Sequence, residues 1–181
     1  MKIVCVGGGP AGLYLAILMK KADPGHRITV LERNQPSDTF GFGVVFSDQT
    51  LSYLRDADAD SYEQITRQFA HWDDIAIHYR GEQLTSTGHG FCGLSRQVLL
   101  SILQQRCQEL GVELRFEQEL HASDLERYRE VDLLLGTDGL NSIVRTHYEQ
   151  EFEPQIDLRP NRFVWLGTTF PFAAFTFYFK E

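Results

Sequence analysis

Apolar residues near the start of the chain fall into two short runs and a longer segment between them. Residues 2–6 (KIVCV) and 27–31 (RITVL) are short, nearly continuous apolar runs, as in buried strands. Between them, residues 11–21 (AGLYLAILMKK) are apolar nearly all round, which indicates an internal helix, and the Asp-Pro-Gly sequence at 23–25 ends it. A strand, a glycine-rich turn, a helix and a strand make a βαβ unit, so we expect these strands to pair in parallel.

The rest of the chain predicts further helices and strands in alternation. Helical spacing or capping marks three segments: Ser47 or Asp48 to about Arg55, Arg96 to Leu110, and 140–148. Strand-like segments are 74–79 and 82–87, joined as a hairpin at Arg80-Gly81, and then 112–117, 131–135, 163–169 and 173–179. Residues 151–162 are polar and carry two prolines, which predicts a crossing between domains.

The last predicted strand has three phenylalanines, Phe175, Phe177 and Phe179, in strict alternation with more polar residues. This period of two predicts one face turned toward a core. An unpaired strand of this composition is prone to unwanted pairing. We therefore expect the segment to be mobile, to pair only with strand 163–169, or to be covered by a neighbouring molecule.

Composition narrows the classes of function. The 181 residues include 17 lysines and arginines against 25 aspartates and glutamates, a net charge of −8 that disfavours nucleic acid as a partner. No apolar window is long enough for a membrane span, and the N-terminal run is broken too early for a signal peptide. Three widely spaced cysteines show no metal-binding spacing, which predicts no metal site and fits free thiols in a cytoplasmic protein.

The sequence GGGPAG contains the spacing Gly7-x-Gly9-x-x-Gly12 between the first strand and the first helix. Such glycines allow a tight turn, the approach of a pyrophosphate to the backbone and close packing of helix on strand. Glu32 ends the second strand, where a carboxylate can accept hydrogen bonds from ribose hydroxyls. The motif predicts a dinucleotide site without separating NAD from FAD; the alternative is glycines that serve only a tight turn.

A second motif, DLLLGTDGLNSIVR, runs from Asp132 to Arg145. Taken alone it is a buried strand, an ordinary Asp-Gly turn and a helix. Together with the first motif, it resembles the flavoprotein aromatic hydroxylases of the para-hydroxybenzoate hydroxylase type, which carry D-x-x-x-G-x-D-G-x-x-S-x-x-R. The segments ERNQPSDTFGFGVVFSDQTL, FAHWDDIAIHYRGE, GHGFCGLSRQVLLSILQQRCQELGVELRFEQ and NRFVWLGTTFPFAAFTFYF resemble the N-terminal part of the salicylyl-CoA 5-hydroxylase and anthraniloyl-CoA (2-aminobenzoyl-CoA) monooxygenase group.

The resemblance implies an α/β fold, a Rossmann-like FAD-binding domain of the glutathione-reductase type with a parallel sheet, followed by the beginning of an antiparallel substrate-domain sheet. It implies FAD-binding residues in three groups. For the pyrophosphate and adenosine they are Gly7, Gly9, Pro10, Ala11, Gly12, Glu32, Arg33 and Leu120. In the second group, Gly43 and Val44 border the isoalloxazine ring, and Arg96 reaches the phosphates and the ribityl region of FAD. For both the flavin and NAD(P)H they are Asp138 and Gly139.

Some of these roles have simpler alternatives. Arg96 could be an ordinary exposed arginine at a helix start, and the loop around Gly43 and Val44 could be only a flexible connection. The implied domains are 1–150, with an inserted hairpin over about 72–93 on the substrate side, and 151–181. The family's later Gly-Asp motif is missing after residue 145, so we expect a truncated chain.

The implied activity is FAD-dependent, NAD(P)H-using hydroxylation of an aromatic ring by dioxygen through a flavin C4a-hydroperoxide. The implied substrate is an aryl-CoA thioester, and a fused or separate reductase domain is a possible partner in the parent protein. No side chain is predicted to be catalytic, because the flavin supplies the chemistry. The alternatives are a non-catalytic FAD-binding fragment and another FAD-dependent oxidoreductase of the same fold.

Overall fold

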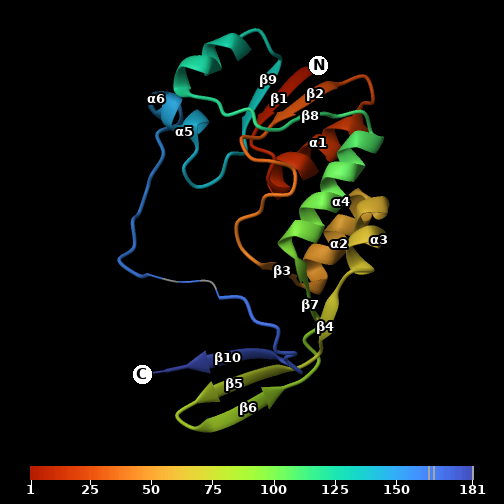
Figure 1. The fold of residues 1–181 in the computed structure, drawn as a ribbon, viewed down its shortest axis with the longest axis vertical. Helices are drawn as coiled ribbons and strands as arrows, with labels where there is room; N and C mark the ends of the chain where they lie inside the picture. The colour runs from red at the N-terminus through yellow and green to blue at the C-terminus, as the bar shows by residue number, and fades with distance from the viewer. Residues whose placement is uncertain (163, 165, 181) are drawn as a thin grey trace. The chain divides into compact units, whose positions relative to one another are not determined.

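The computed structural model describes residues 1–162, 164 and 166–180 (Figure 1). The chain forms two compact units, one of residues 1–38 and 99–163 and one of residues 39–98 and 164–181. The sequence-based boundary near residue 150 and the assignment of the hairpin over 72–93 to the substrate side stay predictions. None of the described helices is long and apolar enough to cross a bilayer.

The first unit is built on a parallel four-stranded sheet in the order β8-β2-β1-β9 (Figure 1). Its strands are β1 (Lys2–Val6), β2 (Arg27–Leu31), β8 (Glu113–Arg115) and β9 (Leu133–Gly136). Val6 at the end of β1 lies opposite Leu31 in β2 and Gly136 in β9. The carboxyl ends of these three strands therefore meet at one edge of the sheet, and the predicted parallel pairing is confirmed.

The core of this unit follows from the apolar runs. Residues 3–6 of β1 are all buried, and α1 (Pro10–Ala22), which connects β1 to β2, buries Leu13, Ala16 and Ile17. Helix α4 (Arg96–Glu109) contributes Cys107, whose thiol donates to the carbonyl oxygen of Leu13 at 3.3 Å. Gly111 follows α4 with a φ of +75°, a left-handed conformation that favours glycine. The predicted helix from Arg96 is thus confirmed.

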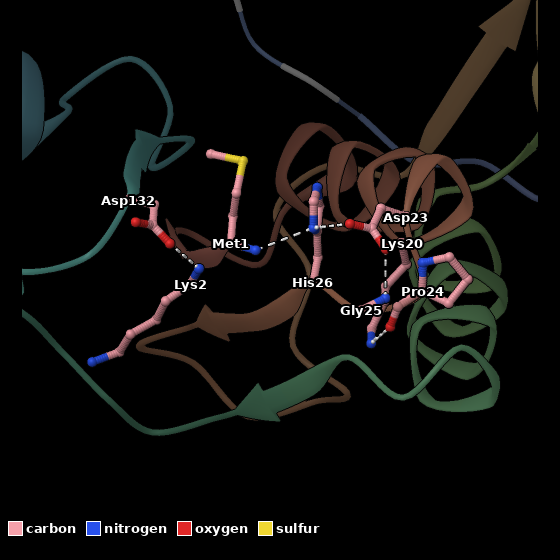
Figure 2. A network of polar contacts seen from close by, with 8 residues as sticks. All are labelled: Met1, Lys2, Lys20, Asp23, Pro24, Gly25, His26 and Asp132. Carbon is pink, nitrogen blue, oxygen red and sulfur yellow. Dashed lines mark hydrogen bonds and ion pairs between the residues drawn. The ribbon is translucent and has the colours of Figure 1, made fainter.

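The opposite edge of the sheet is closed by polar contacts at the chain start (Figure 2). The backbone N–H of Lys2 donates to the carboxylate of Asp132 at 2.5 Å, and the N–H of Asp132 donates back to the Lys2 carbonyl at 2.9 Å. Nearby, Nδ1 of the buried His26 lies 3.3 Å from the α-amino group of Met1 and 3.2 Å from Asp23. The first aspartate of the second motif therefore ties the start of β1 to the segment before β9.

Short helices complete the first unit: the 3-10 helix η1 (Ala122–Tyr128), α5 (Ile143–His147) and α6 (Glu149–Phe152). Helix α5 begins three residues later than predicted, because Ser142 is its N-cap and accepts from the N–H of Arg145. The buried side chains of Val6, Leu125 and Val144 form a small core cluster. This cluster fixes η1 and α5 next to the end of β1.

The second unit contains two three-stranded sheets. The first, in the order β3-β7-β4, is antiparallel and comprises β3 (Gly43–Phe46), β7 (Phe91–Ser95) and β4 (Ala70–Trp72). Helices α2 (Asp48–Ala57) and α3 (Ala59–Thr66) are capped by Ser47 and Asp58. The second sheet, in the order β10-β5-β6, contains the predicted hairpin of β5 (Ile75–Tyr79) and β6 (Glu82–Ser86), with a left-handed φ at both Arg80 and Gly81.

The prediction for the C-terminal strand is wrong in its partner. Strand β10 (Phe175–Phe179) pairs in parallel with β5, and the described residues 164 and 166–169 lie outside any strand; residues 163 and 165 are outside the described part of the chain. The connection at 170–172 is Phe-Pro-Phe, which lacks the glycine, asparagine or aspartate of a tight hairpin turn. Instead, the indole N–H of Trp72 donates to the carbonyl of Phe172 at 3.0 Å.

The predicted burial of this strand is also only partly met. Phe175 is half-buried and its ring stacks on that of Phe91, with 5.0 Å between the centroids. Phe177 is 41% exposed and Phe179 is 58% exposed. Among the described residues, therefore, one phenylalanine of the three is held in a packed environment.

Candidate dinucleotide-binding site

The glycine-rich turn lies where β1 ends, directly against the turn that follows β9. Gly7 has a φ of +107°, and its N–H donates to the carbonyl of Leu31 at 2.8 Å. A Cβ added to Gly7 would overlap the backbone of Thr137, and one added to Gly12 would overlap the carbonyl oxygen of Gly7. These two glycines are therefore required by the packing of the protein itself.

Gly9 has no such reason to be a glycine. Its φ of −72° and ψ of 177° suit any residue, and a Cβ added there would meet no atom of the described residues within 4 Å. The space in front of Gly9 is thus open, and a side chain would fill it. A backbone that must come close to a bound pyrophosphate explains a glycine at this position, so the residues fit a dinucleotide.

The first turn of α1 has the features of an anion-binding helix end. Gly9 is the N-cap and supplies no capping side chain, and Pro10 is the first helical residue. Acidic residues are missing from the first turn, while Lys20 and Lys21 lie in the last turn. The N–H groups of Ala11 and Gly12 at this helix end carry the positive end of the helix dipole, which favours a phosphate.

Glu32 follows β2 and lies beside the glycine-rich turn. Its Oε2 accepts from the N–H of Gly8 at 2.8 Å, and a Cβ on Gly8 would lie 2.9 Å from the Cβ of Glu32. Its Oε1 accepts from both the backbone N–H and the side-chain amide of Asn34, at 2.9 and 2.6 Å. Gly8 and Asn34 were not among the residues that the sequence pointed to, and both determine where this carboxylate lies.

The turn after β9 is linked to the glycine-rich turn by Thr137, another residue that the sequence pattern did not single out. Its N–H and its hydroxyl both donate to the carbonyl of Val6, at 2.8 and 3.0 Å. The hydroxyl also lies 2.9 Å from the carbonyl oxygen of Gly7. Thr137 therefore sets the distance between the two motifs.

Asp138 is occupied by contacts within its own motif. Its carboxylate accepts from the hydroxyl of Ser142 at 2.5 Å and from the N–H of Ile143 at 2.6 Å. Gly139 has a φ of +82° and open space around it. These hydrogen bonds of Asp138 stabilise the turn before α5, and its contact with flavin or NAD(P)H stays a prediction.

The other predicted site residues are spread over both units. In the first unit, Arg33 is exposed, and Leu120 packs on the cluster around Leu125 and so has a packing role. In the second unit, Gly43 and Val44 begin β3 and lie opposite Ser95 and Leu94 in β7.

Arg96, also in the second unit, shows an unmet hydrogen-bonding group. Its backbone N–H donates to the carbonyl of Phe42 at 3.1 Å, whereas its side-chain Nε is buried and has no hydrogen-bond partner among the described residues. A buried donor without a partner is costly. This atom fits a ligand contact better than it fits a solvated arginine at a helix end.

Comparison with known proteins agrees with this geometry. The family model of the FAD binding domain matches residues 1–177. The chain belongs to this family. Membership of this family supports FAD as the cofactor, while its contact with the two motifs stays a prediction.

Curated relatives of the chain are aromatic hydroxylases and monooxygenases. It is 40% identical over 181 residues to a salicyloyl-CoA 5-hydroxylase of Streptomyces sp, covering 100% of this chain and 35% of the relative. It is 31% identical over 167 residues to a 3-hydroxy-4-methyl-anthranilyl-[aryl-carrier protein] 5-monooxygenase of Streptosporangium sibiricum, covering 92% of this chain and 46% of that relative. The chain thus spans between a third and a half of the length of these relatives.

Solved structures share the fold. A tetrameric form of 2-methyl-3-hydroxypyridine-5-carboxylic acid oxygenase matches with a TM-score of 0.70 and 24% identity, covering 81% of this chain and 41% of that one. PqsL of P. aeruginosa, in complex with 2-aminobenzoylacetate, matches with a TM-score of 0.68 and 17% identity, covering 89% of this chain and 48% of that one. The predicted α/β fold with a parallel sheet and antiparallel strand pairing beside it is confirmed; of the two further sheets, β3-β7-β4 is antiparallel and β10-β5-β6 is mixed.

Proposed function

We propose that this protein acts in the FAD-dependent, NAD(P)H-using hydroxylation of an aromatic substrate carried as an aryl-CoA thioester, such as salicylyl-CoA or 2-aminobenzoyl-CoA. The observation that carries the cofactor part is the open space at Gly9, at the uncapped N-terminus of α1. The relatives support the substrate part, since two of them are named for an aromatic acyl group on coenzyme A or on an aryl-carrier protein.

Different residues of the chain bind different parts of FAD in this proposal. The N–H groups at the start of α1 receive the pyrophosphate, with Gly9 keeping the approach clear. Glu32 accepts a hydrogen bond from the adenosine ribose, and its negative charge disfavours a nucleotide with a 2′-phosphate there. In the second unit, Arg96 carries a fixed positive charge and a buried Nε without a hydrogen-bond partner among the described residues, which suits a contact with the phosphates and the ribityl region.

Bound flavin supplies the redox chemistry and the activation of dioxygen. The protein then has to position the ring and keep water away, which requires neither a nucleophile nor an acid–base pair of side chains. The three buried cysteines accord with this. Burial raises the pKa of Cys5 to about 11 and, helped by the nearby Cys5, that of Cys107 to about 12. The pKa of Cys92 is also raised, first by burial and then by Asp48 and Asp73, so all three thiols stay protonated and poorly nucleophilic at neutral pH.

The test is to purify the full chain, titrate it with FAD and follow flavin absorbance and fluorescence. Oxidation of NADH and NADPH is then measured with salicylyl-CoA, 2-aminobenzoyl-CoA and free salicylate, and products are identified by mass spectrometry. We expect saturable FAD binding that is abolished in Gly9→Val and Glu32→Ala, and hydroxylation of a CoA thioester in preference to the free acid. Wild-type protein that fails to bind FAD would refute the proposal. Binding without turnover would restrict the function to flavin binding.

A further inference from the structure

The carboxylate of Glu32 accepts several hydrogen bonds from the protein itself, which leaves little of its acceptor capacity for a ribose. A carboxylate offers about four acceptor positions, two on each oxygen. The described residues fill three of them: Oε1 accepts twice from Asn34, and Oε2 accepts once from the N–H of Gly8. One acceptor position remains, on Oε2.

We propose that Asn34 is a positioning residue for nucleotide binding, which holds Glu32 so that Oε2 alone presents an acceptor to a single ribose hydroxyl. This inference rests on the proposed FAD site and adds a residue to it. The side-chain amide of Asn34 makes the shortest of the three bonds, at 2.6 Å, and it is the one that a substitution can remove without changing the backbone. The backbone N–H bonds from Gly8 and Asn34 then remain.

The neighbouring backbone shows why the amide matters. The carbonyl of Asn34 accepts from the N–H of Glu117 at 3.2 Å, and the carbonyl of Glu32 accepts from the N–H of Gln118 at 2.8 Å. These bonds fix the main chain on both sides of Arg33. The side chain of Glu32, by contrast, has three rotatable bonds, and only its two oxygens are tied. Without the amide, each oxygen keeps a single backbone N–H bond, so the carboxylate is held less tightly and nucleotide binding must remove the added motion.

The decisive variant is Asn34→Asp, which replaces the donor by a second carboxylate facing Oε1. Two carboxylates at this separation repel each other unless they share a proton. At pH 8 Glu32 is therefore pushed away from its place, and FAD affinity should fall about 100-fold. At pH 5 a shared proton restores an O–H donor to Oε1, and most of the affinity should return.

Charged residues of the segments that meet at Glu32 are Arg33 and Asp38 on its own segment and Glu113, Arg115, Glu117 and Glu119 on the segment beside it. Arg115 is paired with Glu113 at 2.9 Å. The matched control is Gln35→Glu, which adds the same charge one residue further on. The side chain of Gln35 faces Glu117 rather than Glu32, with Nε2 and Oε1 3.4 Å apart, so this variant creates an exposed pair of carboxylates that does not involve Glu32. This control should bind FAD as the wild type does between pH 5 and 8.

The experiment is a set of FAD titrations by flavin fluorescence at pH 5 to 8 for wild type, Asn34→Asp, Asn34→Ala and Gln35→Glu, with melting temperatures at each pH. We expect Asn34→Ala to bind about tenfold more weakly at every pH, because it removes one bond to a charged group and adds no charge. If Asn34→Asp does not fold, Asn34→Ala decides: unchanged affinity overturns the inference. It is also overturned if Asn34→Asp follows the wild-type pH profile while only its melting temperature falls. If the wild type itself does not bind FAD, the proposed function fails first, and the inference falls with it.

Discussion

Substitution of Gly9 by alanine should separate ligand binding from folding. At Gly9 the backbone angles allow an alanine, and the added methyl would meet nothing within 4 Å in the part of the chain that the structure describes. Replacing glycine at a compatible position stabilises the folded state by about 0.4–1 kcal/mol. Against this, alanine is a poorer N-cap than glycine, at a cost of up to about 1 kcal/mol. The two nearly cancel, so the free energy of unfolding should change by less than about 1 kcal/mol.

Gly12→Ala in the same motif is the matched comparison. A methyl at Gly12 would overlap the carbonyl oxygen of Gly7 and lie 2.7 Å from the hydroxyl oxygen of Thr137. Backbone atoms cannot move aside as the end of a flexible side chain can, so the cost should reach the upper part of the ~1–3 kcal/mol known for overpacking. Gly12→Ala should thus lose stability before any ligand is added.

The assay is urea unfolding without ligand, followed by FAD titration of each folded protein. Gly9→Ala should unfold at nearly the wild-type urea concentration and bind FAD roughly 10–100-fold more weakly, which corresponds to about 1.4–2.8 kcal/mol of binding energy. Gly12→Ala should unfold at a clearly lower concentration. Wild-type FAD affinity in Gly9→Ala would refute the assignment of the open space to the pyrophosphate. A loss of stability in Gly9→Ala equal to that of Gly12→Ala would refute the packing argument.

Three further predictions concern other parts of the first unit. Asp132→Ala should remove the contact with the Lys2 N–H and lower the free energy of unfolding by about 1 kcal/mol, which thermal melts test. FAD affinity, measured by titration, should stay unchanged, because the contact lies at the opposite edge of the sheet from the glycine-rich turn. Thr137→Val should cost about 1–2 kcal/mol in urea unfolding and weaken FAD binding as well, since its hydroxyl ties the two motifs, and unimpaired binding would contradict that role. Burial raises the pKa of Cys5 to about 11 and that of Cys107 to about 12, so the unfolded chain releases these protons at a lower pH than the folded chain does. The contribution of these two thiols to the free energy of unfolding is therefore fully present below pH 9 and is lost as the pH rises above it. The double variant Cys5→Ala, Cys107→Ala should show a shallower decline of stability at alkaline pH in urea unfolding.

Local pattern was sufficient for the parallel sheet of the first unit and for α1 and α4, whereas η1 (Ala122–Tyr128) was not predicted. The ends of β1, α1, β2 and α4 were predicted nearly correctly. Apolar periodicity and the glycines that end helices or form turns are patterns of residues close together in the sequence, so they can be recognised without the fold. Strand β10 was different. Its partner β5 lies about a hundred residues earlier in the chain, and the pairing depends on contacts such as that of Trp72 with Phe172, which leave no trace in the local sequence.

The second motif shows most clearly which part of a site can be predicted from sequence. Asp138 accepts from Ser142, Ser142 accepts from the N–H of Arg145, and the guanidinium of Arg145 donates to the carbonyl of Leu140 at 2.6 Å. The polar residues that make the motif recognisable therefore bond to one another and define the shape of a turn. Thr137, which joins this turn to the glycine-rich one, is an ordinary residue at an ordinary place in the sequence. The sequence could thus predict the two turns of the candidate site, whereas Thr137, which joins the turns, and Asn34, which contacts Glu32, follow only from the geometry.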